Sequence, residues 1–131
     1  MKMRLTGHAA GAGCYQKGAL MSLSSSPSIA IITTTVASAA DARRLAAQAV
    51  QARLAACVQV ETIASHYVWQ GAQHEDAEWR LTCKTLPQTA PALRAWLRAR
   101  HPYETPQLLT HAAQAEADYA QWVARQVEPH P

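Results

Sequence analysis

The fold is decided by residues 56–85, which read ACVQVETIASHYVWQGAQHEDAEWRLTCKT. Residues 56–69 are rich in β-branched and aromatic side chains, which favours one long strand. The polar residues 71–76 predict a turn. Residues 77–85 predict the antiparallel partner strand, because apolar and polar side chains alternate along them. This stretch therefore predicts one large β-hairpin.

The sequence before and after this hairpin predicts another strand and two helices. Residues 29–36 are apolar and β-branched, as in a buried strand, and Ser38 with Asp41 three residues later predicts the start of a helix. The apolar residues that follow recur at helical spacing: Ala42, Leu45, Ala46, Ala49 and Val50. A second helix is expected to begin near Pro91 and to end before Pro102, because proline suits a first turn and cannot continue a helix.

The last part of the chain completes an α+β pattern. Residues 105–111 predict a final core strand. Tyr119, Trp122, Val123 and Gln126 lie at the spacing of a short terminal helix. The predicted order is βαββαβ with an extra C-terminal helix, which is the ferredoxin-like or split βαβ plan.

Composition bounds the domain organisation and the partners. The chain has 131 residues, of which 49% are hydrophobic, so one domain over residues 28–131 is expected, after a flexible Gly- and Ser-rich tail over residues 1–27. The net charge of +3 is scattered, which argues against a nucleic-acid partner. No run reaches the ~18 apolar residues of a membrane span, so no membrane partner is expected. Two of the three cysteines lie in hydrophobic, strand-like sequence, which indicates a reducing, cytoplasmic setting.

The length of the predicted hairpin indicates more than one subunit. A strand over residues 56–69 would span roughly 45 Å at ~3.3 Å per residue, whereas a domain of about 100 residues has a radius of gyration of ~13 Å. The projecting part carries Ile63, Tyr67, Val68 and Trp69, which would be costly to leave in water. Head-to-tail pairing with neighbouring subunits would cover these side chains and close a ring. A folded-back, bulged hairpin in a monomer is the alternative.

Several separate blocks of this sequence resemble the CutA family of divalent-cation tolerance proteins. The blocks are TTT at 33–35, LAACV at 54–58, SHYVWQG at 65–71, CKT at 83–85, HPYETP at 101–106, and Asp118, Tyr119 and Trp122. The resemblance covers about residues 29–127. It implies a homotrimer of ferredoxin-like subunits that share their long hairpins, similar to the PII signalling trimers, and a role in tolerance to copper and other divalent ions. It brings no established enzymatic reaction, so no catalytic residue is expected.

The resemblance also indicates where a metal ion would bind. In enterobacterial members a copper site is associated with a cysteine at the end of the first strand, an adjacent pair of histidines before Pro-Tyr, and a glutamate after Thr-Pro. These positions fall here on Thr34, on Arg100 and His101, and on Gln107. Only His101 keeps a ligand type, because hydroxyl, amide and guanidinium groups are poor copper ligands. His101 is therefore the candidate ligand for copper or another divalent cation, bound weakly or indirectly and not required for folding.

Two other functions stay open from the sequence. In one, Lys84, Tyr103 and Glu104 join His101 in a cleft between subunits that binds a small anion or a nucleotide, as the PII resemblance implies. In the other, the trimer is a structural scaffold without a small ligand. The segment 100–106 also has a purely structural explanation, because positive charge favours a helix C-terminus and its two prolines fix the direction of the chain.

Overall fold

The computed structural model describes residues 27–127. The elements follow in the order β1 (Ser28–Val36), α2 (Ala39–Gln51), β2 (Cys57–Trp69), β3 (Ala72–Thr85), α3 (Ala90–Arg100), β4 (Leu109–Gln114) and α4 (Ala117–Val127). The predicted order βαββαβ plus a helix is confirmed. The predicted tail over residues 1–27 lies, except for Pro27, outside the described residues.

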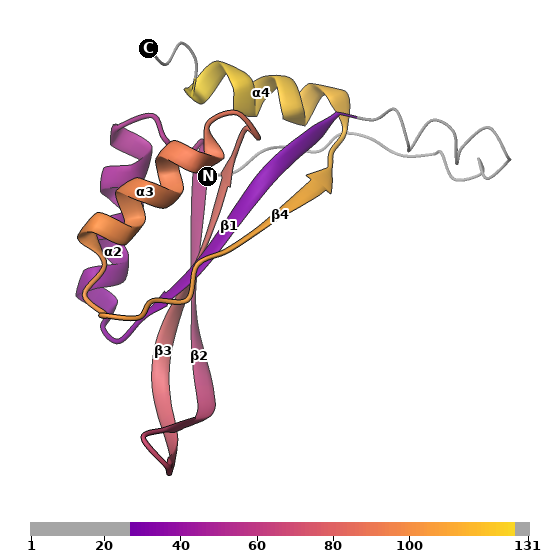
Figure 1. The fold of residues 1–131 in the computed structure, drawn as a ribbon. Coiled ribbons are helices and arrows are strands. Elements are labelled where there is room, and N and C mark those ends of the chain that lie inside the picture. Colours follow the sequence, from indigo (N-terminus) through magenta and orange to yellow (C-terminus); the bar gives the residue numbers. More distant parts are fainter. Residues whose placement is uncertain (1–26, 128–131) are drawn as a thin grey trace, which may run out of the picture.

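The four strands form one sheet in the order β2-β3-β1-β4, and every neighbouring pair is antiparallel. Helices α2 and α3 lie side by side on one face of the sheet, and α4 crosses near the opposite end from the hairpin tip (Figure 1). This is the ferredoxin-like arrangement, in which β3 inserts between β1 and β2. We call the sheet face opposite α2 and α3 the open face.

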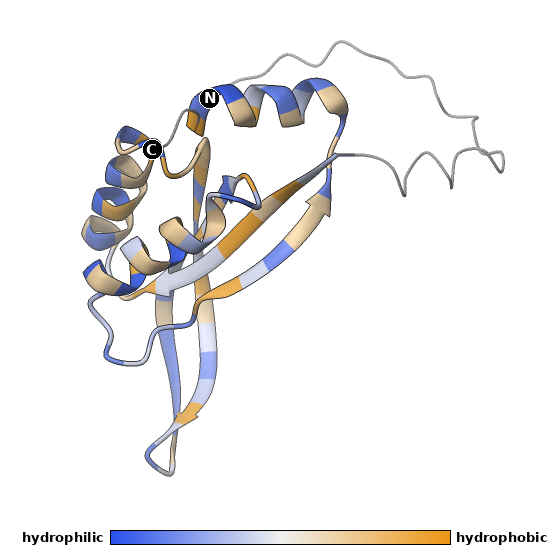
Figure 2. Cartoon of the chain, turned by 45° about the horizontal axis from the view of Figure 1, so that its top comes forward, coloured by the Kyte–Doolittle hydropathy of each residue, from blue (hydrophilic) through white to orange (hydrophobic). Residues whose placement is uncertain are grey.

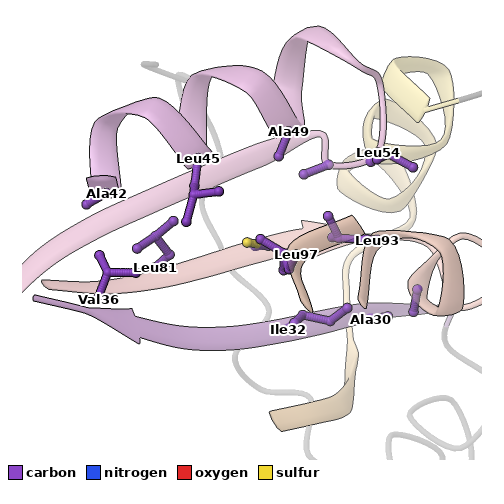
Figure 3. Packing of buried hydrophobic residues seen from close by; sticks show 13 residues of the cluster. Ala30, Ile32, Val36, Ala42, Leu45, Ala49, Leu54, Leu81, Leu93 and Leu97 are labelled. Atoms are coloured by element: carbon purple, nitrogen blue, oxygen red, sulfur yellow. The ribbon is translucent and has the colours of Figure 1, made fainter. Parts of the chain in front are cut away.

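The main core lies between the sheet and helices α2 and α3. Leu45 from α2, Leu97 from α3 and Leu81 from β3 have no exposed surface, and Figure 3 shows them meeting in this layer. Helix α2 begins as predicted, because the Ser38 hydroxyl accepts a hydrogen bond from the Asp41 amide at 3.1 Å. The remaining members of this cluster are Ala30, Ile32, Val36, Ala42, Ala49, Leu54, Ala55, Cys83, Ala90 and Leu93.

A second, smaller cluster fixes α4 against the end of the sheet. Ala120, Val123 and Val127 of α4 are buried against Ile29 and Leu86. Tyr119 and Trp122 pack at its border, which agrees with the predicted helical spacing. No helix within residues 27–127 is long and apolar enough to cross a membrane.

The hairpin of β2 and β3 extends well beyond this core (Figure 1). Its far end exposes Tyr67 (42%), Val68 (64%) and Trp69 (53%), and Figure 2 shows an orange, hydrophobic segment near the tip. The prediction that part of the hairpin projects with apolar side chains is confirmed. No bulge interrupts the pairing between Cys57↔Lys84 and Trp69↔Ala72.

The turn of this hairpin is shorter than predicted. Gln70 and Gly71 have positive φ angles of 52° and 82°, which is the pattern of a two-residue type I′ turn. The predicted turn over residues 71–76 is therefore wrong, because β3 begins at Ala72 and residues 73–76 pair with residues 65–68. These residues are polar because both faces of the projecting hairpin are exposed in this chain.

Gly71→Ala is expected to lower the free energy of unfolding by about 1 kcal/mol, because an alanine at positive φ is strained. A Cβ at this position meets nothing within 4 Å, so the cost is one of backbone conformation alone. Urea denaturation at a fixed subunit concentration measures the change. Gln70→Asn is the matched control and is expected to be neutral or slightly stabilising, since asparagine tolerates this conformation. Equal midpoints for Gly71→Ala and wild type would contradict the expectation.

Two further expectations are corrected. The last strand runs over Leu109–Gln114 rather than residues 105–111, and it is a largely exposed edge strand instead of a core strand. Residues 105–108 belong to the loop before it. Val50 was expected on the buried face of α2 but is 43% exposed, because it lies in the last turn, where only Ala49 reaches the core.

Candidate functional site

The candidate site is built on the loop that follows α3. The helix ends at Arg100, and His101 already has an extended backbone, as Pro102 requires of the residue before it. The β1–β4 ladder stops at Thr33↔Leu109, so the last residues of β1 have no strand on that side. The loop covers this end of β1 and passes the base of the hairpin (Figure 1).

His101 is anchored through both ring nitrogens. Its Nε2 lies 2.9 Å from the Oγ1 of Thr34, and its Nδ1 accepts a hydrogen bond of 3.0 Å from the backbone N–H of Tyr103. Because Nδ1 is an acceptor, the neutral ring carries its proton on Nε2 and donates it to the Thr34 hydroxyl. Burial lowers the pKa of His101 below its ordinary value, which favours this neutral form.

The positions associated with copper in the family do not form a copper site here. Thr34 and His101 are in contact, as the resemblance implies. The Nε2 atom that would bind a metal is, however, already engaged in the hydrogen bond with Thr34. Arg100 turns back along α3, with its guanidinium 4.5 Å from the centre of the Trp96 ring. Among residues 27–127 no three His, Cys, Asp or Glu side chains converge as a metal-binding group. This donor set does not fit copper.

The lowered pKa of His101 makes stability depend on pH. The unfolded chain takes up a proton near the ordinary value of 6.5, whereas the folded chain does so only at lower pH. The contribution of His101 to the free energy of unfolding is therefore fully present above about pH 6.5 and is lost as the pH falls below that value. His101→Asn is expected to remove this part of the slope.

The measurement is urea denaturation between about pH 7.5 and pH 5 at a fixed subunit concentration. His111→Asn is the matched control, since His111 is exposed on β4. Parallel pH profiles for wild type and His101→Asn would contradict the assigned role of His101.

Tyr103 ties the loop to the hairpin. Its hydroxyl donates a hydrogen bond of 2.6 Å to the carboxylate of Glu78 on β3, and its ring contacts that of His101 with centroids 5.1 Å apart. Burial and the Glu78 bond both raise the pKa of the Tyr103 phenol, so it stays protonated. Glu78 was missed from the sequence. Its hydrogen-bond partner, Tyr103, is 25 residues away along the chain. The only sequence signal for Glu78 was its position on the polar side of β3.

A cavity of about 550 Å³ lies between this loop and the hairpin, and we call it the root cavity. Its lining includes Tyr67 and Trp69 from β2, Glu78 from β3, and Tyr103, Glu104 and Gln107 from the loop. Tyr103 and Glu104, which are adjacent in the chain, both line this cavity. His101 lies behind them and is not a lining residue.

Lys84 stands apart from this group within the chain. It lies on β3 opposite Ile31 and Cys57, six residues beyond Glu78, and its Nζ is 5.8 Å from the centre of the Tyr119 ring on α4. The lysine therefore lies toward α4, while the root cavity lies along the projecting part of the hairpin. A single cleft that joins Lys84 to Tyr103 and Glu104 does not form within one subunit.

Residues 30–126 match the family model described as CutA1 divalent ion tolerance protein. The chain belongs to the CutA1 family. It is 37% identical over 95 residues to the divalent-cation tolerance protein CutA of Thermus thermophilus, a match that covers 71% of this chain and 92% of that protein. It is also 37% identical over 89 residues to human Protein CutA, covering 66% of this chain and 50% of the human protein. The chain thus spans about half the length of the mammalian relative.

Solved CutA structures have the same fold. CutA from Synechococcus elongatus PCC7942 superposes with a TM-score of 0.75 at 34% identity, covering 77% of this chain and 91% of that one. CutA1 from Ehrlichia chaffeensis gives 0.73 at 28% identity, with coverage of 78% and 96%. The predicted CutA resemblance and the ferredoxin-like fold are confirmed. The CutA family is known for divalent-cation tolerance and not as a family of enzymes.

Proposed function

We propose that this CutA1 chain acts in divalent-cation tolerance as a cytoplasmic, non-enzymatic homotrimer that binds metal ions weakly or indirectly. The observation that carries the proposal is the anchoring of His101 through both ring nitrogens, by Thr34 at 2.9 Å and by the Tyr103 amide at 3.0 Å. A metal would have to displace the Nε2 proton and the Thr34 contact, and it would find a guanidinium-bearing residue, Arg100, as the neighbour. The free thiols of Cys57 and Cys83 support a reducing compartment.

The sheet supports assembly through its edges. Strand β2 is one edge and β4 is the other, so each subunit offers two unpaired strand edges of different sequence. Two different edges pair head to tail, and such pairing closes into a ring when the rotation between neighbouring subunits allows it. The exposed Tyr67, Val68 and Trp69 give the hairpin an apolar end that a neighbouring subunit would cover.

Size-exclusion chromatography with light scattering tests the assembly. The expected mass is three times the 14.2 kDa of the chain. A single-chain mass at micromolar concentration would overturn the trimer and leave the family assignment intact.

Calorimetric titration of copper(II) and zinc(II) into wild type and His101→Ala tests the metal role. The expected result is no saturable submicromolar binding at His101, and the same heats for both proteins. Saturable submicromolar binding that is lost in His101→Ala would overturn the proposal, since it would show a direct site at this residue.

A second candidate function, the sensing of a small ligand, is favoured by the root cavity. Its volume of about 550 Å³ is in the range of small-molecule sites. A CutA structure from Synechococcus elongatus PCC7942, with a TM-score of 0.71 at 33% identity, is described as complexed with a Bis-Tris molecule. For an anionic ligand or nucleotide bound with Lys84, saturable thermal stabilisation by ATP should be lost in Lys84→Ala. A trimer stabilised by neither metal nor small molecule would favour the scaffold function.

A further inference from the structure

The outer surface of α2 and α3 is strongly basic. The acidic side chains of these two helices are limited to Asp41, which pairs with Arg44 at 2.9 Å. Because α2 and α3 lie side by side on the sheet, their exposed residues share one side of the subunit (Figure 1). We call this side the arginine face, after its five exposed arginines: Arg43, Arg44, Arg94, Arg98 and Arg100.

The opposite charge is concentrated on the hairpin. Strands β2 and β3 hold four acidic and two basic residues, which are Glu61, Glu75, Asp76, Glu78, Arg80 and Lys84. With histidine counted as neutral, the charge is therefore +4 on α2 and α3 and −2 on the hairpin strands. Charges that are scattered along the sequence are thus separated in the fold.

Most of the arginine face has no acidic partner of its own. Among residues 27–127, Arg44 is the only one of its five arginines that forms an ion pair. Arg98 and Arg100 lie in the last turn of α3, where the helix dipole favours a cation. Arg43 and Arg94 lie in the first halves of their helices and gain nothing from the dipole. Arg94 also lies four residues before the like charge of Arg98, which destabilises a helix, so the bare helix pair does not explain this charge pattern.

A groove between the two helices adds groups that suit a peptide. It has a volume of about 350 Å³ and is lined by Gln48, Gln51 and Ala52 on one side and by Trp96 and Arg100 on the other. Side-chain amides donate and accept hydrogen bonds, so they can pair with both groups of a peptide backbone. The Arg100 guanidinium is held 4.5 Å from the centre of the Trp96 ring. A guanidinium stacked in this way can still bind a carboxylate through the N–H groups at its edge.

The arginine face is separate from the surfaces of the proposed assembly. That assembly pairs the edge strands β2 and β4 and covers the apolar end of the hairpin, whereas α2 and α3 lie on the side of the sheet away from the open face. No residue of the arginine face or of its groove belongs to a strand. The face is complete within one subunit, so its test does not depend on the oligomeric state.

The chemistry of this face favours a protein segment over other polyanions. Single-stranded nucleic acid binds by stacking bases on aromatic rings, but the Trp96 ring is covered by Arg100 and packs against the core. Membrane surfaces bind helices that present large apolar side chains, whereas the exposed residues beside the arginines of α3 are Ala92, Ala95 and Ala99. Residues 1–26 of this chain contain no Asp or Glu, so they do not supply the acidic segment.

We propose that the arginine face binds an extended acidic segment of a partner protein. Its carboxylates contact the arginines and its backbone contacts the amides of the groove. Alternate side chains of an extended chain repeat every ~6.6 Å, close to the ~5 to 6 Å between the Cβ atoms of helix residues four apart, such as Arg94 and Arg98. Two short helices offer less area than a standard interface, so weak and salt-sensitive binding is expected.

Fluorescence anisotropy with the full-length protein tests the proposal. The probe is a labelled peptide of about ten residues in which glutamate and serine alternate, and the matched probe has glutamine in place of glutamate. The expected result is saturable micromolar binding of the glutamate peptide, at least about 10-fold weaker binding of the glutamine peptide, and loss of affinity as NaCl rises from about 50 to about 500 mM. Arg98→Glu should weaken binding about 5-fold or more. Arg125→Glu is the matched control, because Arg125 is also exposed in the last turn of a helix, α4, and it should leave the affinity within about 2-fold of wild type.

The other outcomes would overturn the proposal. Equal affinity for the two peptides would exclude recognition of carboxylates. An equal loss in Arg98→Glu and Arg125→Glu would show that only the net charge of the chain matters. A short oligothymidylate and vesicles that contain anionic phospholipid are the competing polyanions, and tighter binding of either, lost in Arg98→Glu, would assign the arginine face to nucleic acid or membrane instead of a protein. Absence of saturable binding to every probe would exclude this face as a docking surface.

Discussion

Leu97→Ala is expected to lower the free energy of unfolding by about 2 to 5 kcal/mol, the largest effect on stability among the variants considered. Leu97 has no exposed surface and lies in α3 against the sheet, where Figure 3 shows it close to Leu93. Removing its branched end forfeits the transfer free energy of the side chain and leaves a cavity that this layer cannot fully close. The same helical turn leads to Arg100 and His101, so the candidate site depends on this packing.

Urea denaturation measures this change, at one subunit concentration because assembly adds to apparent stability. Arg98→Ala is the matched control, since Arg98 is the next residue of α3 and is exposed; its effect should stay within about 0.5 kcal/mol. Leu97→Met, which nearly conserves volume, should cost less than about 1.5 kcal/mol. Unfolding of Leu97→Ala and Arg98→Ala at the same urea concentration would contradict the assignment of Leu97 to the core.

The predictable parts of the fold are those encoded by local chemistry. The Ser38 and Asp41 pair predicted the start of α2, and the bond between them forms at 3.1 Å. Pro102 predicted the end of α3, which stops at Arg100. Capping and proline effects act within a few residues, so they can be read before any tertiary contact is known.

The wrong predictions concern segments whose polarity reflects exposure to solvent and does not reveal their backbone conformation. Residues 73–76 are polar and were predicted as a turn, yet they are strand, because the hairpin projects beyond its own core and exposes both faces. Residues 105–108 were predicted as the start of the last strand, but the ladder starts only at Leu109. In both cases the deciding information was the pairing partner, and a single sequence does not contain it.

The site divides in the same way. Tyr103 and Glu104 were predicted as neighbours because they are adjacent in the chain. Their partner Glu78 is 25 residues from Tyr103, and no local pattern links the two. The contact between Thr34 and His101 spans 67 residues and was anticipated only through the family resemblance. Lys84 was grouped with them on the same basis but lies toward α4.

The family resemblance and the Thr34–His101 geometry together predict a large gain of copper affinity. Thr34→Cys combined with Arg100→His is expected to raise the affinity for copper(I) by on the order of 100-fold or more, because each change replaces a poor ligand by a soft or imidazole ligand. The Oγ1 of Thr34 is already 2.9 Å from Nε2 of His101, so a sulfur at this position starts close to the distance that two ligands of one metal ion require. The second imidazole also removes the repulsive charge of Arg100.

Competition with a chromophoric copper(I) chelator under reducing, oxygen-free conditions measures this affinity and keeps the new thiol reduced. Thr34→Ser is the matched control and should leave the affinity at the wild-type level, because it keeps a hydroxyl. Adding His101→Ala to the double variant should abolish most of the gain. If the gain persists without His101, the new cysteine binds copper elsewhere. If no gain occurs, the Tyr103 amide at Nδ1 holds the His101 ring in the tautomer that cannot bind a metal at Nε2. The loop then prevents a copper site in this CutA1 chain more than the identity of the missing ligands does.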